Sequence, residues 1–379
     1  MPETGGMPCT RLLGRASAPS PRHRRVTQHP ARGVGERLLS GAPGQYGGVV
    51  PSLDPAIAEV RLAVRQALAP HAGSRVVVAL SGGADSLALT AATVFETAKT
   101  GGSVTAVIVD HALQDGSDAV AQRAAEQARS LGADAEVRTV RVDRQHPDGL
   151  EAAARAARYE ALEDAARRAS ASAVLLGHTL DDQAETVLLG LARGSGAASL
   201  QGMAPAREDS DGMRWLRPLL GVRRATTRAF CAASDLEFWD DPHNTDTRFA
   251  RVRARERVLP VLETELGPGI AEALARTADQ LREDAEAFDE MIHETIEDIV
   301  EHAEAGISVS VAALAANPAA LRHRIIRLVV DSEFGAALTR LQTLEVARLV
   351  TDWSGQGPID LPGCSARRVG GRIVFTARA

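Results

Sequence analysis

Residues 75–94 read RVVVALSGGADSLALTAATV, and this stretch decides the fold. Its first part, up to Leu80, is a short and continuous β-branched run, which is typical of a strand buried on both faces of a parallel sheet. Its last part spaces apolar residues among small ones and fits a helix. Strand, glycine-rich turn and helix form a βα unit, whose turn lies at the carboxyl end of the strand, where open α/β sheets bind ligands.

The turn itself, SGGADS at residues 81–86, is suited to a phosphate or pyrophosphate. Its small residues let several backbone N–H groups point toward one position, and the helix that follows adds the positive end of its dipole. It is not a G-x-G-x-x-G loop, and a Walker loop is excluded because Lys99 is the only lysine in the chain. A carboxylate beside phosphate is repulsive unless a divalent cation lies between them, so Asp85 predicts Mg²⁺.

The composition limits the classes of protein that the chain can belong to. Its 379 residues are enough for two domains, and the 3% aromatic content means that aliphatic residues and alanine dominate the cores. A net charge of −6 gives no overall basic signature for nucleic acid, so any RNA surface must be local. Cys9, Cys231 and Cys364 form no metal or disulfide pattern, which favours a reducing cytoplasm. No apolar stretch is long enough to cross a bilayer, so no membrane partner is expected.

Residues 1–50 differ from the rest of the chain. They are rich in Arg, Pro, Gly and Ser and show almost no apolar periodicity, so we expect a disordered tail. An Arg-rich, acid-poor start also fits a transit peptide, an amino-terminal extension that results from the choice of start codon, or a weak RNA-binding arm. The sequence does not decide between them.

From residue 54 to about 200, strand and helix patterns alternate, which predicts a doubly wound parallel α/β sheet. Polar residues follow the predicted strands: Asp110 and His111 come after the strand at 103–109, and Gly177 and His178 come after a later one. Because the carboxyl ends of parallel strands share one edge of the sheet, these residues are candidates for a ligand site.

The helix predicted at 181–192 begins with acids. Asp182 and Glu185 are three residues apart and share a helical face near its amino terminus. Acids also favour a first helical turn through capping and the helix dipole, and this is our interpretation of Asp181. For Asp182 and Glu185 we expect a functional role, because this helix starts where the sheet presents its ligands.

The S-G-G-x-D-S motif after the first strand resembles the PP-loop of the ATP-pyrophosphatase superfamily, whose members cleave ATP between the α- and β-phosphates. Further motifs narrow the resemblance to the tRNA(Ile)-lysidine synthetase family. They are VDH at 109–111, Arg158-Tyr159, GHTLDDQAET at 177–186, LARGSG at 191–196, RPLL at 217–220 and FWDDPHNTDTRFARVRARERVLPVL at 238–262. The family usually has a second histidine at position 179, where this chain has Thr179, so no role is transferred to that residue.

The resemblance implies a two-step ligation on a CAU-anticodon tRNA(Ile). The O2 atom of the cytidine at the first anticodon position attacks the α-phosphate of ATP, and pyrophosphate leaves. The ε-amine of free L-lysine then attacks C2 and expels AMP, leaving lysidine. The implied cofactors are ATP and Mg²⁺, the implied partners are the tRNA and L-lysine, and the implied location is the cytoplasm. The oligomeric state is left open, a homodimer being one option.

The resemblance also assigns roles to residues of this chain. The ATP-binding candidates are Ser81, Gly82, Gly83, Ala84, Asp85, Ser86, Asp110, His111, Gly177 and His178. Asp85 is also the implied Mg²⁺ ligand. The catalytic candidates are Asp85, Asp182, Glu185, Arg158 and Asn244, with the acidic pair binding the lysine ammonium and easing its deprotonation. Arg251 and Arg255, four apart on one helical face, are candidates for phosphate or tRNA contact.

We expect three regions: the tail at 1–50, a PP-loop ATP-binding catalytic domain at 51–262, and a smaller, mainly helical domain at 263–379 that binds substrate tRNA. The last region begins with an acidic, solvated helix and closes with a Gly-rich strand segment at 359–375. Between them lies a helix at 317–330 whose cationic residues are candidates for tRNA contact: Arg322, His323, Arg324 and Arg327.

Three other functions would each explain part of the sequence pattern. A PP-loop tRNA thiolase normally needs a cysteine pair or iron–sulfur ligands, and Cys231 and Cys364 are too isolated to supply them. Another ATP-pyrophosphatase ligase, such as GMP synthetase, would lack the DDPHN block at 240–244. A nucleotide-dependent RNA-binding protein without catalysis would keep the loop but would have no need for Asp182, Glu185 and Asn244 together.

Overall fold

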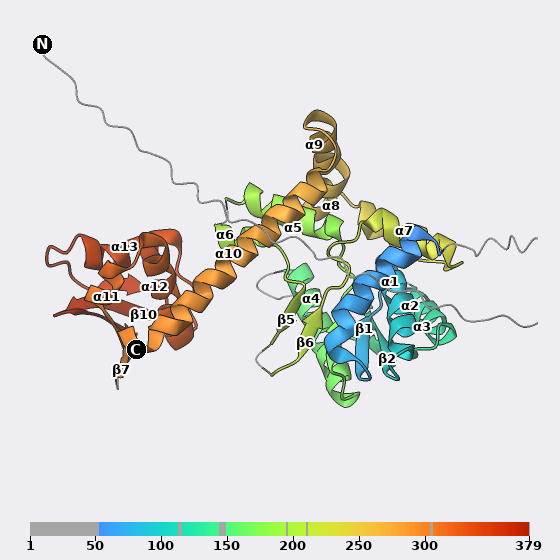
Figure 1. Cartoon of the computed structure of the whole chain (residues 1–379), viewed down its shortest axis with the longest axis horizontal. Helices are drawn as coiled ribbons and strands as arrows, with labels where there is room; N and C mark the ends of the chain where they lie inside the picture. Colours follow the sequence, from blue (N-terminus) through green and yellow to red (C-terminus); the bar gives the residue numbers. More distant parts are fainter. Residues whose placement is uncertain are drawn as a thin grey trace, which may run out of the picture. The chain divides into compact units, whose positions relative to one another are not determined.

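The computed structural model describes residues 53–112, 116–143, 149–194, 196–209, 211–303 and 306–378. The tail predicted at 1–50 lies outside these residues. The described chain forms two β-sheets, each with its own helices and its own hydrophobic core (Figure 1). No helix among the described residues is both long and apolar enough to cross a membrane.

The first sheet has the strand order β3-β2-β1-β4-β6-β5. All neighbours in it run parallel except β5, which pairs antiparallel with β6 at one edge. From β1 the chain moves outward through β2 and β3, then returns to place β4 on the other side of β1. The point between β1 and β4 is therefore a topological switch point, the usual ligand site of open α/β sheets. The strands are β1 (Arg75–Ala79), β2 (Ser103–Asp110), β3 (Asp134–Thr139), β4 (Ala173–Leu175), β5 (Ala206–Glu208) and β6 (Arg214–Leu216).

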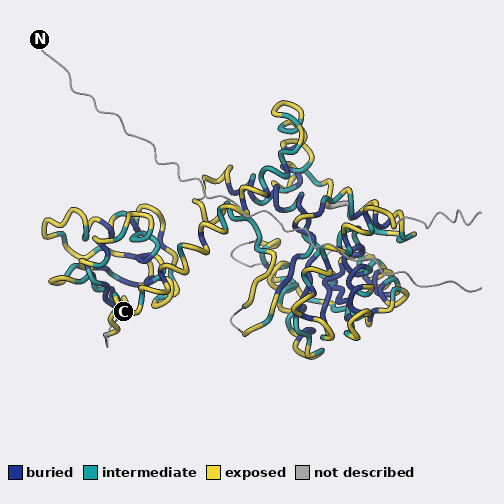
Figure 2. Tube along the Cα trace, viewed as in Figure 1, coloured by how far each residue is buried: buried dark blue, intermediate teal, exposed yellow. Residues whose placement is uncertain are grey.

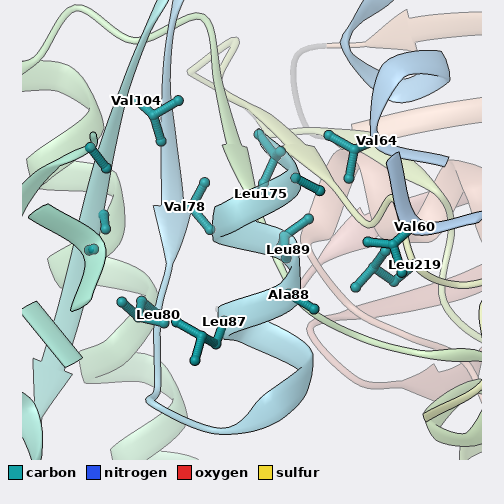
Figure 3. Packing of buried hydrophobic residues seen from close by; sticks show 14 of the residues in the cluster. Val60, Val64, Val78, Leu80, Leu87, Ala88, Leu89, Val104, Leu175 and Leu219 are labelled. Carbon is teal, nitrogen blue, oxygen red and sulfur yellow. The ribbon is translucent and has the colours of Figure 1, made fainter. Parts of the chain in front are cut away.

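Helices cover both faces of this sheet because β1 is apolar on both. Val78 and Leu80 pack with helix side chains such as Val60 and Leu89 (Figure 3), whereas Val77 and Ala79 belong to a separate cluster that includes residues of α4. Figure 2 shows these strands as a buried layer beneath exposed helix surfaces. The helices around the sheet are α1 (Pro55–Leu68), α2 (Ala84–Ala98), α3 (Ser117–Ser130), α4 (Leu150–Arg168) and α7 (Arg224–Ala233).

The chain after β4 adds helices that lead away from the sheet. α5 (Leu180–Ala192) packs against α10 (Ile270–Ile299) through Leu180, Ala184, Ala271 and Ala275. A continuous helical segment at 250–265 contains α8 (Ala250–Arg253), one wide π-helical turn (Ala254–Val258) and α9 (Leu259–Glu265). A single short turn, α6 (Ala197–Leu200), follows α5.

The second sheet is antiparallel, with the order β7-β8-β11-β10-β9. Its apolar face packs on three helices of its own and on the carboxyl-terminal part of α10, forming a core around Phe375, Leu314 and Val346. The strands are β7 (Val300–Ala303), β8 (Gly306–Ser310), β9 (Ile359–Leu361), β10 (Cys364–Val369) and β11 (Arg372–Ala377). The helices are α11 (Val311–Ala316), α12 (Ala319–Phe334) and α13 (Arg340–Thr351).

The predicted fold class is confirmed: a doubly wound, mainly parallel sheet with a smaller second domain. Some details differ. Ser117 is the first residue of α3 and not its N-cap, because Gly116 holds that position with a φ of +80°. The second domain, predicted as mainly helical with one strand segment, carries a five-stranded sheet beside its helices. The predicted boundary at 262/263 lies inside α9 and stays a prediction.

Candidate active site

The phosphate loop, residues 81–86, is held in shape by one hydroxyl. Ser86 Oγ accepts a hydrogen bond from Ser81 N at 3.1 Å and donates one to Gly83 O at 3.0 Å. Gly82 has a φ of +86°, a left-handed conformation that glycine adopts without strain. Gly83 is the N-cap of α2, so the N–H groups of the first helical turn point beyond its end. The loop thus has a backbone form that suits an anion.

Gly177 brings the end of β4 against this loop. A Cβ atom at Gly177 would lie 3.2 Å from both the N and Cα atoms of Ser86, closer than ordinary van der Waals contact. A residue without a side chain is therefore needed for this approach. As a result, α5, which starts three residues later, begins close to the first turn of α2.

The start of α5 fixes the orientation of Asp182. Thr179 is the N-cap, and its N and Oγ1 atoms donate to Asp182 Oδ2 at 2.8 and 2.9 Å. Asp182 N donates back to Thr179 Oγ1 at 3.4 Å, which completes a capping box. Thr179, to which no role was transferred, is fully buried and orients the carboxylate.

Arg224, the first residue of α7, joins three carboxylates. Its Nη2 lies 2.8 Å from Asp182 Oδ1, its Nε 3.4 Å from Asp85 Oδ2, and its Nη1 3.4 Å from Glu185 Oε1. The backbone N of Arg224 donates to Asp181 Oδ2 at 2.7 Å, so Asp181 fixes the start of another helix in addition to lying in the first turn of its own. Arg224 is a site residue that no motif in the sequence predicted.

These contacts shift the pKa values of the groups involved. Burial alone would raise the pKa of Asp182, but the charge of Arg224 and the hydrogen bonds from Thr179 hold it below its usual value. Burial raises the pKa of Asp85, although Thr227 and Arg224 oppose this shift. Asp182 is therefore a stable anion in the ligand-free site, and Asp85 is the less strongly compensated carboxylate.

Glu185 is fully buried and belongs to an arginine cluster. Arg255 donates to it through two nitrogens, Nε to Oε1 at 2.7 Å and Nη2 to Oε2 at 3.1 Å. Arg251 Nη2 donates to Thr186 Oγ1 at 2.9 Å, and its Nε lies 3.6 Å from Glu185 Oε2. Both arginines predicted to contact phosphate or tRNA thus converge on Glu185 in the ligand-free structure.

α7 and the segment after it also hold the phosphate loop. Thr227 is fully buried, and its Oγ1 is in hydrogen-bond contact with Asp85 Oδ1 and lies 2.8 Å from Arg224 O. Trp239 N donates to Gly82 O at 2.9 Å. Thr227 and Trp239 are positioning residues that sequence reasoning missed, because neither lies next to the loop in sequence.

Most of the predicted residues line one cavity of about 840 Å³. They are Ser81, Gly83, Ala84, Asp85, Ser86, Arg158, Gly177, His178, Asp182, Asn244 and Arg255. Asp110 and His111 line a neighbouring cavity of about 270 Å³, to which Ser81 and Arg158 also contribute. Glu185 lies apart from both, in a smaller recess with Arg224 and Arg255.

His178 is held neutral. Burial, together with the charges of Arg158, Arg217 and Arg155, lowers its pKa to about 3, although Asp182 acts in the opposite direction. Its buried Nδ1 has no hydrogen-bond partner among the described residues. A neutral imidazole in the wall of an anion site can donate or accept one hydrogen bond without adding charge.

The pKa of His178 predicts an acid-sensitive fold. Unfolded His178 takes up a proton near pH 6.5, but folded His178 does so only near pH 3, so the free energy of unfolding should fall as the pH drops from 6.5 toward 3. At pH 5 the loss from this residue should be about 2 kcal/mol. Melting curves at pH 7.5 and pH 5 should therefore show a smaller drop for His178→Gln than for the wild type. His293→Gln, on the exposed side of α10, should match the wild type; an equal drop in all three proteins would contradict the prediction.

Two protein-family models match separate parts of the chain. Residues 57–262 match the model of the PP-loop domain, and residues 310–374 match the TilS substrate binding domain. Among solved structures, the U34-tRNA thiolase NcsA from Methanococcus maripaludis, described with its [4Fe-4S] cluster, has a TM-score of 0.51 at 18% identity. The match covers 60% of this chain and 80% of the thiolase, and at this identity it shows the fold alone.

Curated relatives are much more similar over nearly their full length. The tRNA(Ile)-lysidine synthase of Leifsonia xyli subsp. xyli is 58% identical over 309 residues, which cover 81% of this chain and 91% of the relative. The synthase of Rhodococcus erythropolis is 51% identical, covering 82% and 90%, and that of Thermobifida fusca is 47% identical, covering 85% and 98%. With the phosphate loop, the acidic pair and both domain models present, the chain belongs to the tRNA(Ile)-lysidine synthase family.

Proposed function

We propose that this protein is an ATP-dependent ligase that joins L-lysine to C2 of the cytidine at the first anticodon position of CAU-anticodon tRNA(Ile), releasing AMP and pyrophosphate. One observation carries the proposal. The phosphate loop and Asp182 line the same cavity at the switch point of the sheet, so an anion site and a cation site lie together. A reaction that activates a base with ATP and then adds an amine needs this combination.

In the first step the phosphate loop would hold the pyrophosphate of ATP. The N–H groups at the start of α2 and the hydroxyls of Ser81 and Ser86 would stabilise the negative charge that grows as pyrophosphate leaves. Arg158 lines both cavities, so its guanidinium can reach a nucleotide that occupies them together. Asp110 and His111 would then border the nucleoside part.

Mg²⁺ fits the donor set at the loop. Mg²⁺ in nucleotide sites usually takes one or two carboxylates in addition to phosphate oxygens and water. Asp85 supplies a carboxylate at the loop, and the hydroxyl of Thr227 orients it. When bound, the ion would neutralise charge on the departing pyrophosphate. Within the described residues, no cluster of three or more His, Cys, Asp or Glu side chains forms a site for metal alone, so the phosphates would complete the coordination.

In the second step the acidic pair would serve the lysine amine. Asp182 lines the large cavity and is a stable anion, so we assign it the ammonium contact. Glu185 is buried behind it and is held by Arg255, which suits a role in fixing the charge distribution around the amine. Loss of a proton from the ammonium makes it a nucleophile, and this carboxylate pair would ease that loss. Asn244 also lines the cavity and would contact the cytosine edge.

Basic residues of both domains would contact the tRNA. Arg251 and Arg255 each make contacts at Glu185 or Thr186 that use only part of the five N–H donors of a guanidinium. In α12, the pKa of His323 is lowered by burial and by the charges of Arg322, Arg327 and Arg340. These residues form a local positive region in a chain whose net charge is negative.

The thiolase alternative has little support among the described cysteines. Cys231 and Cys364 are both buried and free, and they belong to the cores of different sheets. Burial raises the pKa of Cys231 to about 12, so this thiol is a poor nucleophile. Sulfur transfer would need a reactive thiolate or cluster ligands in the cavity.

The decisive experiment for function uses purified protein, ATP, Mg²⁺, L-lysine and CAU-anticodon tRNA(Ile). Nucleoside mass analysis of the digested tRNA should show lysidine, with AMP and pyrophosphate formed in equal amounts. A tRNA with a different first anticodon base serves as the control and should remain unmodified. A thiolated nucleoside, or ATP cleavage with no modified base, would contradict the proposal.

Two variants should separate the half-reactions. Asp85→Asn should block adenylation of the tRNA, since it removes the carboxylate beside the phosphates while keeping the shape of the side chain. Asp182→Asn should still adenylate the tRNA but should lose lysine transfer by at least about a hundredfold, the scale of a positioned acid–base group. Single-turnover assays with α-labelled ATP would resolve the adenylated tRNA from the final product. Equal loss of both steps in Asp182→Asn would show that this residue serves ATP instead.

The basic region of α12 predicts a change in salt dependence. Arg327→Ala should weaken tRNA binding and reduce the slope of log K against log salt by about one, as expected for one lost phosphate contact. Fluorescence titrations at several salt concentrations measure this slope. Arg348→Ala removes an exposed arginine of α13 outside the cluster and should leave the slope unchanged. An unchanged slope in Arg327→Ala would remove α12 from the tRNA-binding surface.

A further inference from the structure

Arg224 occupies the position at which the proposed reaction would place Mg²⁺ and the lysine ammonium. Its guanidinium contacts Asp85, which we assign to Mg²⁺, and Asp182, which we assign to the lysine ammonium. These carboxylates come from different helices, α2 and α5, and a third helix supplies the arginine. In the ligand-free state, the side chain of Arg224 thus neutralises both Asp85 and Asp182.

The other arginines of the site cannot replace it. Arg255 is engaged by Glu185 at 2.7 Å, and its contact with Asp182 is longer, at 3.6 Å. For Asp85, Arg224 is the only cationic side chain in ion-pair contact within the described part of the chain. Arg224 is therefore the principal counterion of Asp182 and Asp85, whereas Glu185 keeps a second partner.

A guanidinium and a lysine ammonium cannot both be held closely by Asp182 in this partly buried site. Two like charges about 4 Å apart repel strongly in a site that is largely shielded from water. L-lysine must therefore displace Arg224, or find it already displaced. Phosphate oxygens are a suitable new partner, because the planar guanidinium fork matches them well.

The geometry allows this exchange without moving the helix. The backbone N of Arg224 is fixed by Asp181 Oδ2 at 2.7 Å, so only the side chain needs to rotate. The side chain is 20% exposed and lines the same cavity as the phosphate loop. A nucleotide bound at the loop would lie within the reach of this long side chain.

We infer that Arg224 is a built-in counter-cation that withholds Asp182 from L-lysine until ATP is bound. In the nucleotide-free enzyme it occupies the acidic centre; when ATP binds, it turns to the phosphates and frees Asp182 for the ammonium. Arg224 is thereby a positioning residue that couples the two substrate sites and sets their order. The inference rests on the proposed function, since it takes Asp182 as the ammonium site.

Calorimetric titration of L-lysine tests the coupling directly, with and without α,β-methylene-ATP and Mg²⁺. Wild-type protein should bind lysine at least about tenfold more tightly when the analogue is present. Arg224→Met keeps the length of the side chain but removes its charge, so it should bind lysine about tenfold more tightly than wild type without nucleotide. The analogue should then add little to its affinity.

Matched variants separate this effect from a structural one. Arg223→Met removes the neighbouring arginine, which pairs with Asp181 and Glu272 outside the acidic centre, and should keep the wild-type coupling. Arg224→Lys retains the charge and should keep the dependence on nucleotide. If Arg224→Met does not fold, as judged by its melting curve, Arg224→Gln takes its place, and the wild-type coupling still tests the inference.

These titrations distinguish failure of the Arg224 inference from failure of the proposed function. Lysine affinity of the wild type that is equal with and without the analogue overturns the role of Arg224 but leaves the ligase proposal standing. Unchanged nucleotide-free affinity in Arg224→Met also overturns it. A wild type that binds the analogue but never binds lysine overturns the proposed function, and the inference falls with it.

Discussion

The balance of buried charge at the start of α5 is the constraint on which the site depends. Asp182 and Glu185 carry negative charge into a region with little solvent, and an uncompensated charge there would be strongly destabilising. Arg224 and Arg255 compensate it, and each comes from a segment distant in sequence from α5. The ion pairs consequently fix the positions of α7 and of the helical segment at 250–265 relative to the sheet. The same contacts therefore stabilise both the proposed catalytic groups and the architecture.

The topology of the sheet explains why an anion site lies beside these acids. β1 and β4 are neighbours, and the chain leaves their carboxyl ends into α2 and α5. α7 also begins at this edge, so three helix amino termini, with their partial positive charges, face one region. Such a region both attracts phosphate and stabilises carboxylates. Competition between bound carboxylates and incoming anions for the same positive groups follows directly from this arrangement.

Sequence reasoning predicted those parts of the molecule whose signals are local. The β-branched run before the glycine-rich turn predicts β1 and α2, and the three-residue spacing of Asp182 and Glu185 places them on one helix. The second sheet was mostly missed because its strands are short and β8 and β9 are separated by three helices. In such a sheet the pairing partners are distant, and single strands carry little periodic signal.

The missed site residues share the same physical cause. Arg224 meets Asp182 across 42 residues of chain and Asp85 across 139, and an arginine that opens a helix usually points into solvent. Thr227 reads as an ordinary helix residue until α7 is packed on α2. The resemblance to a known family supplied the roles of Arg158 and Asn244, which no spacing rule would have singled out. For Asp181 the sequence predicted only part of the role. Its place in the first turn of α5 was predicted, but the hydrogen bond that it accepts from Arg224 N was not.

Because of the wide turn at Ala254–Val258, the site depends on the number of residues in this segment as well as on their identity. A π-helical turn contains one more residue than an α-helical turn spanning the same rise, and such turns are frequent at functional sites. Arg255 lies within it, while Arg251 lies in the regular helix just before it. Deleting one residue between Arg251 and Arg255 would shorten their separation from four residues to three and so change the direction of one side chain relative to the other. The contacts that both arginines make at Glu185 would then have to rearrange. An insertion or deletion in this segment would therefore disturb the site even where both arginines were retained.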